Sequence, residues 1–172
     1  MTDLPFHDGE LTAQMRFNEN WDEGRAHKLG RIIGNSLDER MAWFIESLPF
    51  FFLATSDKQG HCDCSFKGSE PGPDGRPLPV ALVTGPQQLL LPDFSGNRMF
   101  NSLGNILVNP HVGMIFIDFA SQTRLRVNGA AAILEDENGS VWHSRWPQAQ
   151  RAVEVTVEQV YWNCSKRIPQ HP

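Results

Sequence analysis

The chain has 172 residues, of which 40% are hydrophobic and 20% charged, as expected for one globular domain with an ordinary core. The formal net charge is -5, and Lys and Arg are scattered along the chain, which argues against a protein that wraps nucleic acid. Met1 to Glu10 carry Asp and Glu where a secretion signal has basic residues, and no apolar run approaches ~18 residues, so we expect neither export nor a membrane span.

The N-terminal part, residues 1–35, is predicted to be an arm with one short helix, because a few apolar residues stand among many polar ones. Residues 36–172 are predicted to form the domain. Ser36 followed by Glu39 is a capping-box pattern, and apolar residues then recur at helical spacing until Pro49. This pattern predicts a helix over residues 37–48.

Beyond this helix the sequence changes to short runs rich in β-branched and aromatic residues. They predict strands over residues 50–55, 62–67, 89–91, 112–119, 125–134 and 153–162. A polar connection ending in Gly60 joins the first two as an antiparallel hairpin, and a helix is predicted over residues 97–108. Short strands without regular helical crossovers favour a mainly β fold, a six-stranded antiparallel barrel that is closed or partly closed.

The first candidate ligand-binding segment is the turn before this second helix. A strand runs into a glycine-containing turn, and the helix then opens with Asn97, Arg98 and Ser102. The first turn of a helix presents unpaired N–H groups and partial positive charge, and an arginine can grip two phosphate oxygens together. The segment predicts an anion site, although Asn97 could simply cap the helix while Arg98 stays a solvated surface charge.

The second segment is the strand over residues 62–67. Alternation places Ser65 and Lys67 on one face and Cys64 and Phe66 on the other. Gly68 would let the backbone approach a flat ring, and the Pro- and Gly-rich residues 69–79 are expected to form a covering loop. The alternative is an edge strand with a solubilising lysine.

The third segment puts Arg124 and Arg126 on one face of a strand whose other face is apolar. The two arginines either face solvent or an acidic neighbour, or line an intersubunit groove where they bind phosphate or the polar edge of a ring.

The three cysteines, Cys62, Cys64 and Cys164, cannot all pair within one chain. They also lack the paired Cys-x-x-Cys spacing of zinc sites, so no metal site is predicted. Unpaired thiols favour a reducing compartment, and we expect a cytoplasmic protein.

Taken together, these segments resemble the pyridoxamine 5′-phosphate oxidase-related, FMN-binding split-barrel family. The likeness extends over residues 49–135 and depends on the order of its pieces: the strands at 48–55 and 60–68, the turn at 90–98, the helix at 101–107, the connection at 109–113 and the strand at 125–131. The tail at 160–166, with an aromatic residue followed by Cys-x-Lys, is similar to the closing strand of the family.

The resemblance implies a homodimer with FMN in grooves at the subunit interface. It places Ser65 and Lys67 along the flavin and its phosphate, Arg98, Ser102 and Asn105 near the phosphate and ring edge, and Arg124 and Arg126 in a polar wall from this subunit or its partner. The predicted cofactor-binding set is Ser65, Phe66, Lys67, Gly68, Asn97, Arg98, Ser102, Asn105, Arg124 and Arg126.

The sequence has no hydrolase or nucleotide-fold motif, and the resemblance implies an FMN-dependent oxidoreductase that acts on an unknown small molecule, with NAD(P)H as a candidate donor. No catalytic side chain is identified. Residues 166–171 lack the Arg-x-His-x-Arg-like element that true pyridoxamine phosphate oxidases use, so vitamin B6 oxidation is not implied. Two alternatives remain: a non-enzymatic module that binds flavin, haem or deazaflavin, and a structural dimer with an empty groove.

Overall fold

The computed structural model describes residues 5–18, 21–135 and 141–169, and the chain divides into two compact units, Met1–Gly34 and Asn35–Pro172. Residues 170 and 171, at the end of the segment 166–171 considered above, lie outside the described residues. The first unit contains α1 (Asp8–Phe17) and α2 (Glu23–Gly30), two helices where one was predicted. Side chains of His7 and Asp22 cap their N-termini, and α1 buries no residue, which explains why apolar spacing did not reveal it.

The second unit begins with α3 (Glu39–Ser47), close to the helix predicted over residues 37–48. Its N-cap is Asp38 and not Ser36: the Asp38 carboxylate accepts a hydrogen bond of 2.7 Å from the backbone N–H of Met41. Phe44 and Ile45 are buried and attach the helix to the core.

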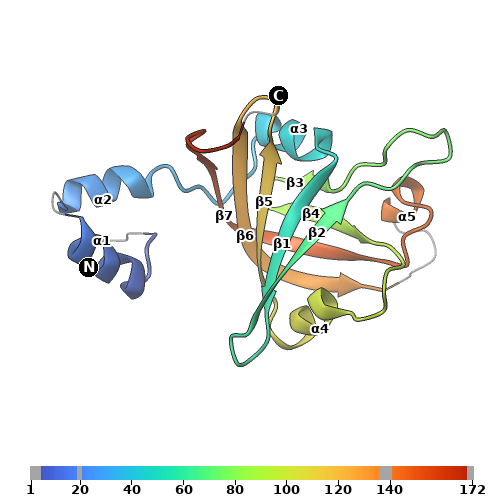
Figure 1. Ribbon diagram of the computed structural model, residues 1–172, viewed down its shortest axis with the longest axis horizontal. Helices are drawn as coiled ribbons and strands as arrows, with labels where there is room; N and C mark the ends of the chain where they lie inside the picture. The colour runs from blue at the N-terminus through green and yellow to red at the C-terminus, as the bar shows by residue number, and fades with distance from the viewer. Residues whose placement is uncertain (1–4, 19–20, 136–140, 170–172) are drawn as a thin grey trace. The chain divides into compact units, whose positions relative to one another are not determined.

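In the described part of the chain, seven strands follow in one antiparallel sheet (Figure 1): β1 (Phe50–Ser56), β2 (Cys62–Gly68), β3 (Leu82–Gly85), β4 (Gln88–Asp93), β5 (His111–Asp118), β6 (Thr123–Leu134) and β7 (Arg151–Asn163). Their order in the sheet is β2-β1-β5-β6-β7-β4-β3. The predicted fold class, a mainly β antiparallel split barrel, is confirmed, but with seven strands and not six. The missed strand, β3, has four residues, too few for alternation to be visible.

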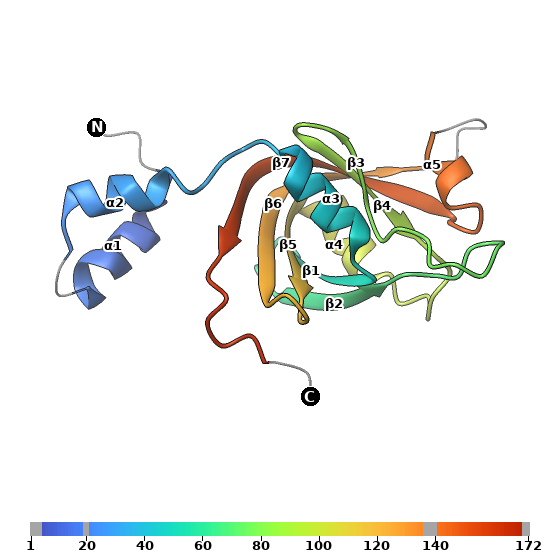
Figure 2. The ribbon, with the colours of Figure 1, turned by 90° about the horizontal axis from the view of Figure 1, so that it is seen from above.

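The sheet curls so that one face of each strand encloses the core (Figure 2). Phe51, Leu53, Phe116, Leu125 and Val127 alternate with more exposed neighbours along β1, β5 and β6 and are almost fully buried. Lys67 of β2 lines one small cavity with Leu91 and Pro92 of β4, although no pairing joins β2 to β4 in the described sheet. The barrel is therefore split between these two strands.

A second apolar cluster covers the other face of β3, β4 and β7, next to α5 (Val141–Arg145). The indole N–H of Trp146, a fully buried residue, donates to the carbonyl of Pro79 at 2.6 Å. Within the described residues, no helix is both long and apolar enough to cross a membrane.

The helix α4 (Asn101–Val108) connects β4 to β5. It was predicted to start at Asn97 but starts at Asn101, because Arg98 (φ 62°) and Phe100 (φ 55°) adopt left-handed backbone conformations that interrupt a helix. The amide of Asn105 donates to the hydroxyl of Thr55 at 2.9 Å, which fixes α4 against β1.

Candidate functional site

A cavity of about 400 Å³ lies at the entrance of α4, and we call it the α4-entrance pocket. Its walls are Asp63, Ser65 and Lys67 from β2, residues 93–103 from the turn and the start of α4, and Gln150. The period of two along β2 explains why these three residues share the pocket while Cys64 and Phe66 point away from it. The predicted meeting of the β2 segment with the turn before the helix is thus present.

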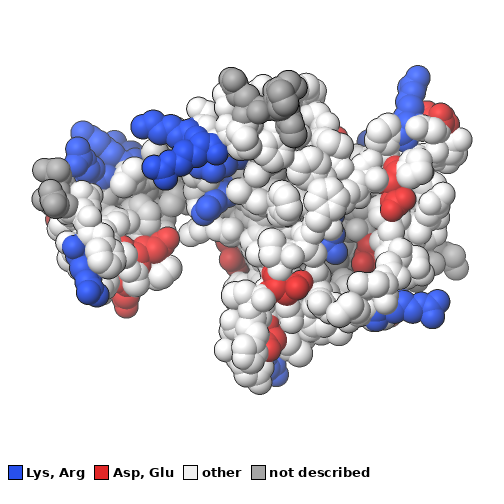
Figure 3. Space-filling view, in the orientation of Figure 1, with Lys and Arg blue, Asp and Glu red and all other residues white. Residues whose placement is uncertain are grey.

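Positive charge in the pocket comes from Lys67 and Arg98, neither of which forms an ion pair with a described residue. The carboxylate of Asp93 is bound to the guanidinium of Arg151 at 2.7 Å, so it does not neutralise them. Asp63 is the other acidic residue in the lining. On the right-hand part of the surface in Figure 3, basic and acidic side chains are interspersed.

The backbone at the entrance of α4 also suits an anion. The helix has no side-chain hydrogen bond at its N-cap, Phe100, whereas side chains cap α1, α2 and α3. Asn101, Ser102 and Leu103, in the first turn, line the pocket, where their N–H groups and the helix dipole add partial positive charge. Left-handed backbone at two non-glycine residues costs about 1–3 kcal/mol each and is concentrated at ligand-binding sites.

Two hydroxyls connect the halves of the pocket. Ser65 on β2 and Ser102 on α4 are hydrogen-bonded through their Oγ atoms at 3.0 Å. Ser102 is only 7% exposed and is one of two buried polar residues in the described core. The pair fixes the distance between strand and helix and presents two hydroxyls to an occupant.

Five predicted site residues share the pocket: Ser65, Lys67, Asn97, Arg98 and Ser102. The Oδ1 atom of Asn97 accepts a hydrogen bond from the backbone N–H of Met99 at 3.0 Å, so it shapes the turn but caps no helix.

The other predicted residues lie elsewhere. Asn105 binds Thr55, as described above, and is outside the lining. Phe66 lies on the opposite face of β2, and a Cβ at Gly68 would come within 2.9 Å of the Phe66 ring, so a larger residue there would require that exposed side chain to shift. Arg124 and Arg126 belong to the far part of the sheet and do not line the pocket.

The outward face of the sheet forms a second region, which we call the outer sheet face. One row of residues in register crosses five strands: Phe66, Phe52, Ile115, Arg126 and Tyr161. Phe66 is 61% exposed although it stacks on Phe50 with ring centroids 5.2 Å apart. Aromatic surface of this kind is typical of an interface.

The arginine end of the outer sheet face has unsatisfied polar atoms. Arg124 and Asn163 are opposite each other in register, and the Nε of the first and the Oδ1 of the second are buried without a hydrogen-bond partner among the described residues. Such an atom costs about 1–3 kcal/mol when it stays unpaired. Arg126 donates a long hydrogen bond of 3.4 Å to the hydroxyl of Tyr161.

Sequence reasoning missed Asp63, Asp93 and Gln150 in the pocket and Asn163 on the outer sheet face. Asp63 lies two residues before Ser65, so the alternation that grouped Ser65 with Lys67 would also have found it. Gln150 and Asn163 reach their places only through the pairing of β7 with β4 and β6, for which the sequence has no local signal.

Comparisons with known proteins agree with this architecture. A family model for pyridoxamine 5′-phosphate oxidase matches residues 37–164. No curated protein sequence matches the chain. Among solved structures, a candidate pyridoxamine 5′-phosphate oxidase from Lactobacillus delbrueckii has a TM-score of 0.56 and 20% identity, covering 74% of this chain and 95% of its own.

Two further structures have the same fold. The HupZ protein of Group A Streptococcus has a TM-score of 0.54 and 14% identity, covering 73% of this chain and 93% of its own. An FMN-binding protein from Syntrophomonas wolfei has a TM-score of 0.50 and 9% identity, covering 82% and 95%. At these identities the likeness establishes a shared fold.

Proposed function

The chain belongs to the pyridoxamine 5′-phosphate oxidase family, and from this premise we propose that it is a homodimeric flavoprotein that holds FMN by its phosphate in the α4-entrance pocket. The observation that carries the proposal is the meeting of Lys67, Arg98 and the uncapped first turn of α4 at one cavity. A phosphate monoester carries a charge of about -1.5 to -2 at pH 7 and has three acceptor oxygens. Two unpaired cations and a set of backbone N–H donors match both properties.

The remaining residues of the pocket complete this cradle. The hydroxyls of Ser65 and Ser102 supply donors that can rotate toward a phosphate oxygen. Because Asp93 is already paired with Arg151, the two cations Lys67 and Arg98 face one other carboxylate in the lining, that of Asp63, and removal of water leaves a net positive charge in need of an anion. An FMN-binding protein among the structural neighbours, from Syntrophomonas wolfei, supports the choice of the flavin.

The outer sheet face supports the second half of the proposal, the homodimer. Its exposed Phe66 and half-buried Phe52 gain free energy when a second copy covers them, at about 25 cal/mol per Å² of apolar surface. In such a dimer, the unpaired Arg124 Nε and Asn163 Oδ1 can form hydrogen bonds with the polar edge of the flavin ring that the partner subunit binds. Arg124 and Arg126 therefore act in the site of the other subunit.

When bound, FMN supplies hydride and one-electron transfer, which no amino-acid side chain performs. The residues of this chain bind the phosphate, position the ring and place positive charge near it. Cationic groups near a flavin favour its reduced, negatively charged form. We propose a reduced nicotinamide as donor and a small molecule as acceptor.

A second candidate is a flavin carrier without turnover. The α4-entrance pocket, whose titratable side chains include Lys67 and Asp63, is assigned to the phosphate, so no acid or base is identified at the flavin ring. Anaerobic addition of NADPH separates the two: bleaching of the flavin band and recovery with an acceptor fit the oxidoreductase, and a band that stays unchanged fits the carrier.

The exposed thiols of Cys62, Cys64 and Cys164, none of them in a disulfide, support our further proposal that the protein works in the reducing cytoplasm.

The experiment that tests the flavin proposal compares FMN with riboflavin, which differs only by lacking the phosphate. Flavin fluorescence quenching gives both dissociation constants with the full-length protein stripped of any flavin. We expect FMN to bind tighter by about 100-fold or more, from at least two charge-assisted contacts of ~1.5–3 kcal/mol each, those of Lys67 and Arg98. Equal affinity for the two flavins would show that the FMN phosphate does not bind in the α4-entrance pocket.

A further inference from the structure

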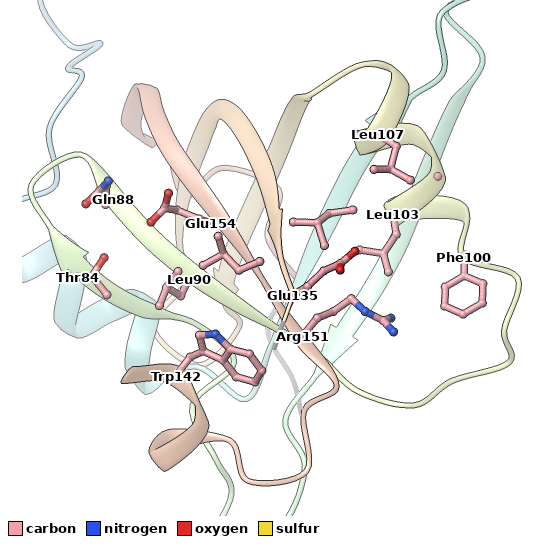
Figure 4. Close-up of a pocket in the computed structure, with 13 residues that line it drawn as sticks. Thr84, Gln88, Leu90, Phe100, Leu103, Leu107, Glu135, Trp142, Arg151 and Glu154 are labelled. Carbon is pink, nitrogen blue, oxygen red and sulfur yellow. The ribbon is translucent and has the colours of Figure 1, made fainter. Parts of the chain in front are cut away.

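A second and larger cavity, of about 1410 Å³, lies between α4 and α5 on the outer side of β4 and β7, and we call it the α4–α5 groove (Figure 4). Its apolar lining comes from four elements: Leu90 of β4, Leu103 and Leu107 of α4, Leu134 of β6 and Trp142 of α5. It adjoins the α4-entrance pocket only through Phe100 and Leu103. The flavin proposal leaves this cavity unused.

The charged residues in the lining of the groove are Glu135, Glu154 and Arg151. Arg151 is already neutralised by Asp93 at 2.7 Å. Neither glutamate forms an ion pair or a side-chain hydrogen bond with any residue that the structure describes. The groove therefore combines apolar walls with two uncompensated negative charges.

Glu154 is the more informative of the two. It lies near the start of β7, in register with Leu90 on β4 and with Ala132 on β6, and it is partly buried. Glutamate is depleted in strands, and a carboxylate beside apolar neighbours loses solvation without gaining a partner. In the view of Figure 4, the Glu154 carboxylate lies toward Gln88 and the Glu135 carboxylate toward Leu103, on opposite sides of the groove.

We propose that the α4–α5 groove binds a small organic ammonium ion with an apolar body. The ammonium group would pair with the partly buried Glu154 carboxylate, and the body would cover the leucine side chains. The volume exceeds that of a typical small-molecule pocket, ~300–1,000 Å³, so it does not restrict the occupant to a compact cation.

The test uses full-length protein and 4-phenylbutylammonium as the probe, with 4-phenyl-1-butanol as its neutral analogue and 5-phenylvalerate as its anionic one. Isothermal titration at pH 7 should give a dissociation constant at least tenfold lower for the ammonium than for the alcohol, and no binding of the carboxylate. Glu154→Gln should weaken the ammonium about fivefold or more, the effect of ~1 kcal/mol for a contact at 4 Å in water. Glu135→Gln, on the opposite side of the groove, should have a smaller effect.

Glu158→Gln is the matched control, since Glu158 is exposed on the same strand and outside the groove. Glu154→Asp keeps the charge and should retain most of the affinity, which separates charge from folding. Equal binding of alcohol and ammonium, or unchanged affinity in Glu154→Gln, overturns the proposal. A change of oligomeric state in the Leu107→Lys variant also overturns it, because that result would show that a second copy of the chain occupies the groove in the natural protein. Affinity for FMN should be the same in all the glutamate variants, so the flavin proposal stands or fails separately.

Discussion

Replacement of Lys67 by Met isolates the charge that the proposed phosphate site requires. The Lys67 stem lies beside Leu91 and Leu103 in a narrow space of about 20 Å³, and its side chain also lines the α4-entrance pocket. Methionine has a similar length and fills the space of the stem, so the change mainly removes the ammonium group. We therefore expect little loss of folding stability.

The expected loss of FMN affinity follows from the contact removed. A hydrogen bond to a charged group contributes about 1.5–3 kcal/mol, and each ~1.4 kcal/mol is a factor of ten in the dissociation constant. Lys67→Met should thus weaken FMN by about 10- to 100-fold. Arg98 and the first turn of α4 remain, so binding should not vanish. Riboflavin, which has no phosphate, should bind the variant and the natural protein equally.

Fluorescence titrations of both flavins with Lys67→Met, Lys67→Arg and Lys58→Met make the measurement decisive. The arginine variant keeps the charge and should recover most of the affinity. Lys58 is exposed in the β1–β2 turn and serves as the control for a lost lysine. If FMN and riboflavin lose the same factor in Lys67→Met, the lysine acts on the ring or on folding, and our placement of the phosphate is wrong.

Two other predictions concern assembly and the sheet. Phe66→Glu puts a charge on the outer sheet face and should convert the proposed dimer to a monomer, as measured by light scattering. The control Val108→Glu, at an exposed apolar position of α4, should leave the dimer intact. A monomeric natural protein would contradict the proposed homodimer. Gly129→Ala should lower the free energy of unfolding by about 1–3 kcal/mol or more in urea titrations, because its Cβ would collide with the Thr156 backbone carbonyl. Gly104→Ala, with open space around it, should be neutral or stabilising by up to ~1 kcal/mol. An equal effect of the two substitutions would contradict this packing.

Alternation predicted much of the sheet because it depends on each strand alone. The pattern along β2 correctly separated Ser65 and Lys67 from Phe66, and the structure places the first two in the pocket. The grouping of Phe66 with them as cofactor-binding residues came from the family resemblance, and the period of two places its ring on the other face.

The turn before α4 shows what local pattern cannot supply. A helix from Asn97 fits the composition, but Arg98 and Phe100 adopt left-handed backbone that propensity assigns to glycine or asparagine. Such conformations persist only where the surrounding structure enforces them. The buried Trp146 was missed for a related reason, since its hydrogen bond is to Pro79, far away in the chain. The strand β3 pairs with its neighbour β4 and was missed because it is short.

The two faces of β2 give the proposed cofactor site and the proposed dimer a common basis. Lys67 points to the α4-entrance pocket and Phe66 to the outer sheet face, while Arg124, predicted for the same ligand, lies three strands away on that outer face. Within one subunit these groups cannot converge. If FMN contacts both subunits, it binds the dimer more tightly than the monomer. Added flavin must then stabilise the dimer by mass action, and by the same free energy with which dimerisation strengthens flavin binding. Dimer dissociation that is insensitive to FMN would therefore assign Arg124 and Arg126 to the interface alone.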